Sequence, residues 1–163
     1  YRFVHDSLGS NFRITEMQSA IGRIQLKKLK SWRGIRTKNA NIISEILKNN
    51  SLVRIPLPEE GLIHAWYKFN CFINMNNLKD DWDREKIIKS IRSKGIPAFQ
   101  GSCSELYLEK CFSNKSDINY EVLPIARELG MTNLTFLLHP TIHENEMIFY
   151  AENIDKVLKQ AIK

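Results

Sequence analysis

The chain has 163 residues, of which 43% are apolar and 26% charged, and its formal net charge is +6. These values are typical of one ordinary globular domain or two small ones, and they exclude a disordered, collagen-like or disulfide-scaffold chain. Residues 1–50 hold ten Lys or Arg against three Asp or Glu, whereas residues 51–163 hold fourteen against fifteen. The basic first third favours an anionic partner, so a nucleic acid or an acidic membrane has to be considered.

The cysteines and the apolar runs bear on the cellular compartment. Cys71, Cys103 and Cys111 are odd in number and have no CxxC spacing, which indicates reduced thiols in a cytoplasmic protein. No apolar run reaches the roughly eighteen residues of a membrane span, and no signal peptide begins the chain, so we expect neither insertion nor secretion. The four histidines are not at metal-ligand spacing, so we expect no metal site.

The first regular element expected is a helix that follows a turn-forming loop. Its start has the form of a capping box, in which the Thr15 hydroxyl and the Gln18 side chain each bond to the other residue's backbone N–H. Apolar residues then recur at helical spacing, but the stripe shifts beyond Ile24. The shift predicts a break or bend within residues 27–34, followed by a second helix that ends at Asn50.

The rest of the chain alternates between predicted strands and helices. Residues 64–75 alternate with period two and are rich in aromatic side chains, which predicts a half-buried strand. The remaining expected elements are a helix over 80–94, a strand over 96–99, short helices over 105–112 and 123–129, a strand over 134–139, and a helix after a second capping box at 141–144. The inner stripe of this last helix is expected to be Met147, Ala151, Ile154, Leu158 and Ala161. This order predicts an α+β fold, in which long helices precede a small mixed or antiparallel sheet covered by helices on one side.

The loop before the first helix is the best candidate for a binding site. Asn11 and Arg13 immediately precede a capped helix start, where free N–H groups and the positive end of the helix dipole favour an anion. Asn11 could donate its amide to a phosphate oxygen, and Arg13 could add a bidentate charge. Judged by spacing alone, it is equally reasonable that Asn11 only turns the loop and that Arg13 pairs with Glu16, because any helix start has this form.

Aromatic and basic side chains form two further candidates. His64, Trp66 and Tyr67 combine apolar rings with polar tips and could line a site for a sugar or a base. The residues themselves favour the alternative, in which these aromatics pack into a core. The basic run on the first helices is most simply a solvated face, because a nucleic-acid groove would carry interleaved aromatics and only Trp32 is present. No nucleophile elbow, P-loop or zinc motif occurs, so a regulatory or interaction domain also remains open.

Several segments of the chain also resemble a known enzyme family. The stretch GSNFRITEMQSAIGRIQLKKLKSW, followed by RTKNA and HAWYKF, closely resembles DegT/StrS-class pyridoxal-phosphate-dependent nucleotide-sugar aminotransferases. GIPAFQGSCSELYLEK and LPIARELGMTNLTFLLHPTI resemble later segments of the same family. The resemblance implies the C-terminal part of such an enzyme, with linking helices and an interface loop over residues 1–50 and the small α+β domain of a fold type I enzyme over 51–163. The large cofactor-binding domain would then precede this chain.

The resemblance also implies an activity and a set of site residues. The parent would transfer an amino group, with glutamate as the expected donor, to a keto carbon of a nucleotide-linked deoxysugar, using pyridoxal 5′-phosphate. The lysine that carries the cofactor would lie outside this chain, so no catalytic residue is assigned and the fragment alone is expected to be inactive. Asn11 matches an asparagine that reaches the cofactor phosphate of the neighbouring subunit in a homodimer, with Arg13 beside it. Tyr67, with His64 close by, matches a position near the nucleotide-sugar.

The sequence leaves the type of reaction, a nucleic-acid partner and the identity of the sugar open. Certain family members dehydrate the sugar, with a histidine in place of the lysine, and that position would lie outside this chain. A non-enzymatic basic module that binds nucleic acid is a further alternative. Residues 101–105 read GSCSE where many members have a histidine and a proline, so the sugar is not specified. The expected setting is surface-glycan or O-antigen lipopolysaccharide synthesis in the cytoplasm, with neither a nucleic acid nor a membrane as partner.

Overall fold

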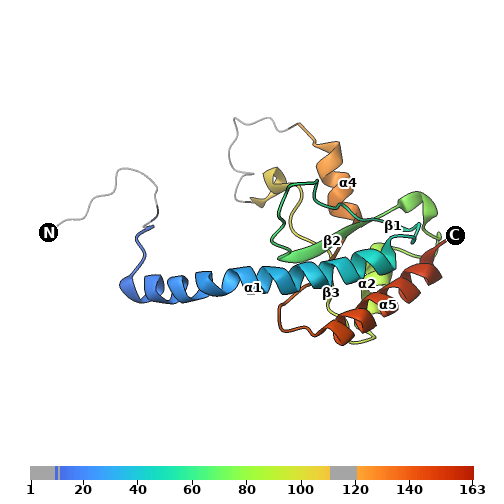
Figure 1. Cartoon of the computed structure of the whole chain (residues 1–163). Coiled ribbons are helices and arrows are strands. Elements are labelled where there is room, and N and C mark those ends of the chain that lie inside the picture. Colours follow the sequence, from blue (N-terminus) through green and yellow to red (C-terminus); the bar gives the residue numbers. More distant parts are fainter. Residues whose placement is uncertain (1–9, 11, 111–120) are drawn as a thin grey trace.

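The computed structural model of the chain describes residue 10, residues 12–110 and residues 121–163. The helices and strands, shown in Figure 1, are α1 (Glu16–Leu47), β1 (Val53–Arg54), β2 (Lys68–Ile73), α2 (Arg84–Arg92), β3 (Ala98–Phe99), α4 (Pro124–Thr132), β4 (Asn133–Leu137) and α5 (Glu144–Ala161). The strands form one sheet in the order β1-β2-β4-β3, and every pair is antiparallel. The predicted α+β fold with a small sheet is therefore confirmed.

β2 and β4 form the centre of the sheet and define its two faces. Phe69 pairs with Phe136, and both side chains are buried in a core that they share with residues of α1, α2 and α5. On the opposite face the Thr135 hydroxyl donates to Asn70 Oδ1 at 2.7 Å. α4 lies on this second side, away from α5 (Figure 1), so the sheet has helices on both sides and not on one alone.

α1 is a single helix of 32 residues, so the predicted break within residues 27–34 is wrong. No proline interrupts the helix, and a side chain at Gly34 would meet nothing within 4 Å. The apolar stripe shifts because the two halves of α1 have different surroundings. The second half buries Ile43 and Leu47 beside α5, whereas nearly every described residue of 12–31 is exposed. A helix with nothing packed along its first half needs no single buried face.

The two predicted capping boxes have different outcomes. At the start of α1, Gln18 N–H donates to Thr15 Oγ1 at 3.3 Å and Thr15 N–H donates to Gln18 Oε1 at 3.0 Å, so the first box is confirmed. α5 begins after His143 without a side-chain cap, so the second box is wrong. The Thr141 hydroxyl bonds instead to His139 Nδ1 at 2.7 Å. All five residues predicted for the inner stripe of α5 are buried.

Several boundaries differ from the predicted ones. β2 begins only at Lys68, so the first residues of the predicted strand are irregular. Gly130 lies within α4, because that helix continues to Thr132. Within the predicted helix over 105–112 the structure describes a 3₁₀ turn at Leu106–Leu108, and the last two residues lie outside the described range. Among the helices that the structure describes, none has the length and apolar character that crossing a membrane requires.

Candidate functional site

The predicted anion loop lies at the free end of α1. Asn11 is outside the described residues, whereas Arg13 is described and exposed. The capping box uses the N–H groups of Thr15 and Gln18, which leaves those of Glu16 and Met17 as first-turn donors. These N–H groups, the positive end of the helix dipole and the Arg13 guanidinium are all suited to an anion.

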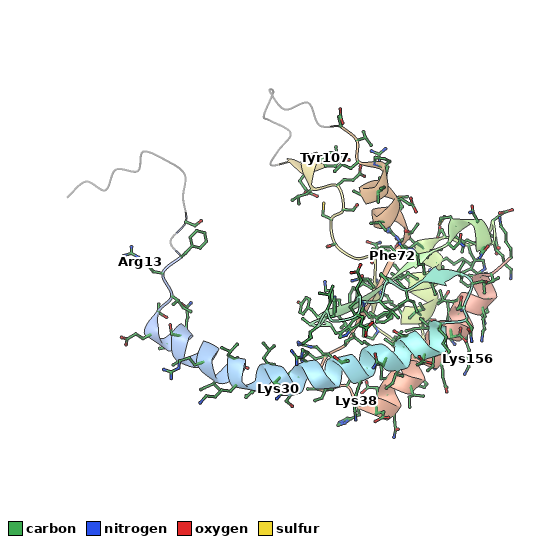
Figure 2. All side chains as sticks on the ribbon, turned by 45° about the horizontal axis from the view of Figure 1, so that its top comes forward. Arg13, Lys30, Lys38, Phe72, Tyr107 and Lys156 are labelled. Atoms are coloured by element: carbon green, nitrogen blue, oxygen red, sulfur yellow. The ribbon has the colours of Figure 1, made fainter. Side chains whose placement is uncertain are left out.

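The loop is remote from the sheet of its own chain. Figure 2 shows Arg13 at the far end of α1, well separated from Phe72 of β2 and from Tyr107. The structure therefore does not bring Arg13 together with the other predicted site residues, His64 and Tyr67. An anion held by Arg13 would need a second polypeptide surface to enclose it.

The cluster at the start of β2 divides into buried and exposed rings. Trp66 is 7% exposed and stacks on Phe69 with ring centroids 5.9 Å apart, so the core interpretation is correct for this residue. Tyr67 is 73% exposed, and the Lys68 ammonium lies 5.6 Å from its ring. His64 is exposed, and its Nδ1 accepts the Trp66 N–H at 2.9 Å. Tyr67 is therefore the ring that is free to contact a ligand.

His64 and Trp66 also line a surface hollow of about 380 Å³. The opposite wall is α1, which contributes Thr37 and Asn41. The rim is apolar and consists of Leu57, Pro58, Leu62 and Ile63. The hollow combines an apolar lining with a few polar groups, as small-molecule sites do.

Residues 101–105 line a second hollow, of about 440 Å³. Glu105 fixes this segment, because its carboxylate accepts from Arg127 at 3.1 Å and from the Tyr107 hydroxyl at 2.7 Å. The backbone of α4 comes so close that a Cβ on Gly130 would lie 1.9 Å from Ser104 Oγ. Sequence reasoning missed this contact; the only signal for it is a glycine inside an amphipathic helix.

Among the described residues, Cys71, Cys103 and the acidic side chains give no sign of nucleophilic or metal chemistry. Burial raises the pKa of the Cys71 thiol to about 12. Cys103 donates to Glu109 at 3.0 Å, and this hydrogen bond raises the pKa of the Cys103 thiol. In the part of the chain that the structure describes, no group of His, Cys, Asp and Glu side chains is arranged to hold a metal ion.

Comparison with known proteins identifies the class to which this fold and site belong. Residues 1–154 match the DegT/DnrJ/EryC1/StrS aminotransferase family, and the chain belongs to this family. The resemblance drawn from the sequence motifs is thereby confirmed. Pyridoxal phosphate is the cofactor of the family, and the solved Streptococcus pneumoniae protein Spr1654, 16% identical with a TM-score of 0.76, is in its PLP form. That structure is matched over 92% of this chain and 37% of its own.

Two further relatives show the extent of the likeness. An aminotransferase from Psychrobacter cryohalolentis is 40% identical with a TM-score of 0.84, over 99% of this chain and 43% of that chain. GDP-perosamine synthase of Escherichia coli O157:H7 is 21% identical over 95% of this chain and 39% of its own length. The chain therefore spans about two fifths of the relatives that it matches.

The described residues fit one part of such a cofactor. A guanidinium and free helix N–H groups are suitable donors for its phosphate group. The exposure of Arg13 and its distance from the sheet show that the described residues form no enclosure around that group. Arg13 and the start of α1 are therefore chemically suited to a phosphate group, and the described residues by themselves form no complete cofactor site.

Proposed function

We propose that this chain is the C-terminal part of a pyridoxal-phosphate-dependent aminotransferase that aminates a keto group on a nucleotide-linked deoxysugar, with glutamate as donor. The family match over residues 1–154 carries the proposal, because it includes the exposed loop and the capped start of α1. The likeness to GDP-perosamine synthase supports a nucleotide-sugar substrate. The bound cofactor supplies the electron sink that amino transfer requires.

Asn11 and Arg13 are assigned to the phosphate of a cofactor held by the neighbouring subunit of a homodimer. The position of Arg13 at the free end of α1 supports contact with another subunit (Figure 2). A guanidinium binds phosphate oxygens through two parallel hydrogen bonds, and the start of α1 adds the favourable end of its dipole. These groups orient the cofactor; they do not act on the reacting atoms.

Tyr67 is assigned to the substrate, with His64 beside it. Stacking on a sugar or a base needs an exposed ring, and Tyr67 is exposed whereas Trp66 is buried. The segment over residues 101–105 is proposed as a second wall of the sugar site. Because this segment departs from the family pattern, the identity of the sugar is proposed to depend on it.

The exposed half of α1 is assigned to an interface with the rest of the longer protein. Residues 1–50 would link a preceding large domain to the small domain over 51–163. The exposed apolar side chains near the start of the chain are Phe12, Ile14, Met17, Ile21, Ile24, Leu26 and Leu29. Several large exposed apolar side chains close together in the sequence are typical of an interaction site. The matched relatives have more than half of their length outside the match, which provides a partner of sufficient size.

The phosphate assignment can be tested in the full-length protein with Arg13→Gln, and with Lys38→Gln as a control that removes one exposed positive charge from the packed half of α1. Loss of a charge-assisted hydrogen bond is expected to raise the dissociation constant for pyridoxal phosphate about tenfold in Arg13→Gln. Lys38→Gln should bind the cofactor as the unaltered protein does. Equal affinities in all three proteins, measured by absorbance titration, would contradict the assignment.

The reaction itself can be tested by analysis of the product. Aminotransferase activity predicts a glutamate-dependent amino sugar, whereas a dehydratase of the same family would give a deoxygenated sugar without the amine. A surface-glycan or lipopolysaccharide pathway located in the cytoplasm is proposed for the product.

The alternative function, nucleic-acid binding, predicts that the protein binds DNA with an affinity that falls steeply with salt. The absence of DNA binding at low salt would exclude this alternative.

A further inference from the structure

The backbone just before β2 is strained at a bulky residue. Trp66 has φ = 48° and is the sole non-glycine with positive φ in the part of the chain that the structure describes. This left-handed region is unfavourable for a large side chain, so the surrounding contacts have to hold it there. Strain of this kind is typical of positions where the direction of the chain matters for function.

The side chain of Trp66 packs into the hydrophobic core. It is buried, and it stacks on Phe69 with planes 17° apart. Phe69 is itself fully buried and pairs with Phe136 of β4. Trp66 is therefore attached to the centre of the core, while Tyr67, the next residue, remains exposed.

His64 holds the backbone of the same turn. Its Nδ1 accepts the Trp66 N–H at 2.9 Å, and its ring packs on the indole with centroids 4.3 Å apart. A side-chain acceptor that bonds the N–H two residues later closes a small turn, as Asn and Asp do in Asx-turns. Since His64 and Trp66 both line the hollow beside α1, the bond also fixes one wall of that hollow.

We propose that His64 is a positioning residue, whose Nδ1 holds the Trp66 N–H and so keeps the strained turn that directs Trp66 inward and Tyr67 outward. The imidazole has to present Nδ1 without a proton, because only then does that atom accept. The role of His64 in the turn at Trp66 holds whatever reaction the protein catalyses. The effect of that turn on substrate binding through Tyr67 rests on the proposed function.

Two substitutions of His64 separate its acceptor from its bulk. His64→Asn keeps an oxygen acceptor near the position of Nδ1, whereas His64→Leu keeps apolar bulk against the indole and removes the acceptor. In the full-length protein, hydrogen exchange of the Trp66 amide is expected to be at least about fivefold faster in His64→Leu. His64→Asn should exchange at nearly the rate of the unaltered protein.

The amides of Phe69 and Phe136 provide the reference for an intact sheet. If His64→Leu loses protection there as well, His64→Gln replaces it, because its acceptor lies one bond farther along the side chain. The proposal is overturned if the Trp66 amide exchanges at the unaltered rate in His64→Leu. It is also overturned if the Trp66 amide in His64→Asn is no better protected than in His64→Leu or, where that variant is replaced, in His64→Gln.

Kinetics of the full-length enzyme test the consequence for the substrate. His64→Leu should raise KM for the nucleotide-sugar with little change in kcat, and His64→Asn should restore KM. If Trp66 exchange is faster in His64→Leu but the enzyme does not act on any nucleotide-sugar, the role of His64 in the turn stands and the proposed function is rejected. If Trp66 exchange is unchanged in His64→Leu and the enzyme is active on a nucleotide-sugar, the proposed function stands and the role of His64 is rejected.

Discussion

At the scale of single residues, the two described cysteines show how environment sets chemistry. Cys71 is fully buried in the core beneath the sheet, and its thiol is held in the neutral form well above pH 9. Cys103 is exposed, but its hydrogen bond to Glu109 also favours the neutral thiol. Since the thiolate is the reactive species, neither residue resembles an activated nucleophile.

Alkylation of the folded protein with iodoacetamide at about pH 8 should distinguish the two thiols. Cys103 should be modified slowly, and Cys71 only after denaturation, because it is both buried and protonated. Peptide mapping reads each cysteine separately. Modification of Cys71 in the folded protein at a rate similar to that of Cys103 would contradict the buried position.

The raised pKa of Cys71 also predicts a dependence of stability on alkaline pH. The folded-state pKa of about 12 lies above the ordinary thiol pKa of 9.0, so the contribution of the neutral thiol to stability is complete below pH 9.0 and is lost as pH rises toward 12. Unfolding by urea at increasing pH should therefore show a fall in that window. Cys71→Ala should be less stable at neutral pH and should show a smaller fall.

At the scale of elements, α1 is one helix with two environments. Its second half buries Ile43 and Leu47 beside α5, while Ile21 in its first half is 54% exposed. The first half continues the helix of the packed half and is capped by Thr15, but it contributes no residue to the core. The half of α1 for which we propose an interface is thus the half that buries least of its own surface within the described residues.

Two substitutions of the same kind should differ sharply in their effect on this chain. Ile43→Ala removes buried volume and is expected to lower the free energy of unfolding by about 2–5 kcal/mol. Ile21→Ala removes exposed surface and should change it by less than about 0.5 kcal/mol. Urea denaturation of both variants measures the difference. Similar losses would mean that the first half of α1 is packed.

At the scale of the whole molecule, the structure has a compact part and a projecting arm (Figure 1). The sheet, α2, α4, α5 and the end of α1 are mutually packed, whereas the first half of α1 and its loop extend away. Much of the positive charge of residues 1–50 lies on this arm. The family match and the exposed apolar stripe together favour a protein interface over a nucleic-acid groove for this region.

Deletion of residues 1–30 should therefore leave the compact part folded. The free energy of unfolding is expected to stay within about 1 kcal/mol of that of the full chain, because almost all the described side chains within the deleted range are exposed. Light scattering should show less self-association, because the apolar stripe is gone. A loss of cooperative unfolding after the deletion would show that the arm supports the core.

Elements with local signals could be predicted from the sequence alone. The Thr15 capping box, the inner stripe of α5 and the strand around Phe69 are predictable because caps and periodicity depend on neighbours along the chain. The motif around Asn11 and Arg13 likewise identified the family before any fold was known. The same local reading failed at residues 141–144, where Thr141 bonds to His139 instead of capping α5.

Which neighbours each sequence pattern packs against depends on the three-dimensional fold. A shifted apolar stripe was compatible with a broken helix or with one helix in two environments, and the presence of α5 along only half of α1 decided between them. The positive φ of Trp66 and its bond to His64 leave no periodic signal, because they depend on Phe69 and the core behind it. The burial of a side chain depends on which residues pack against it in the fold, and local sequence patterns do not identify those residues.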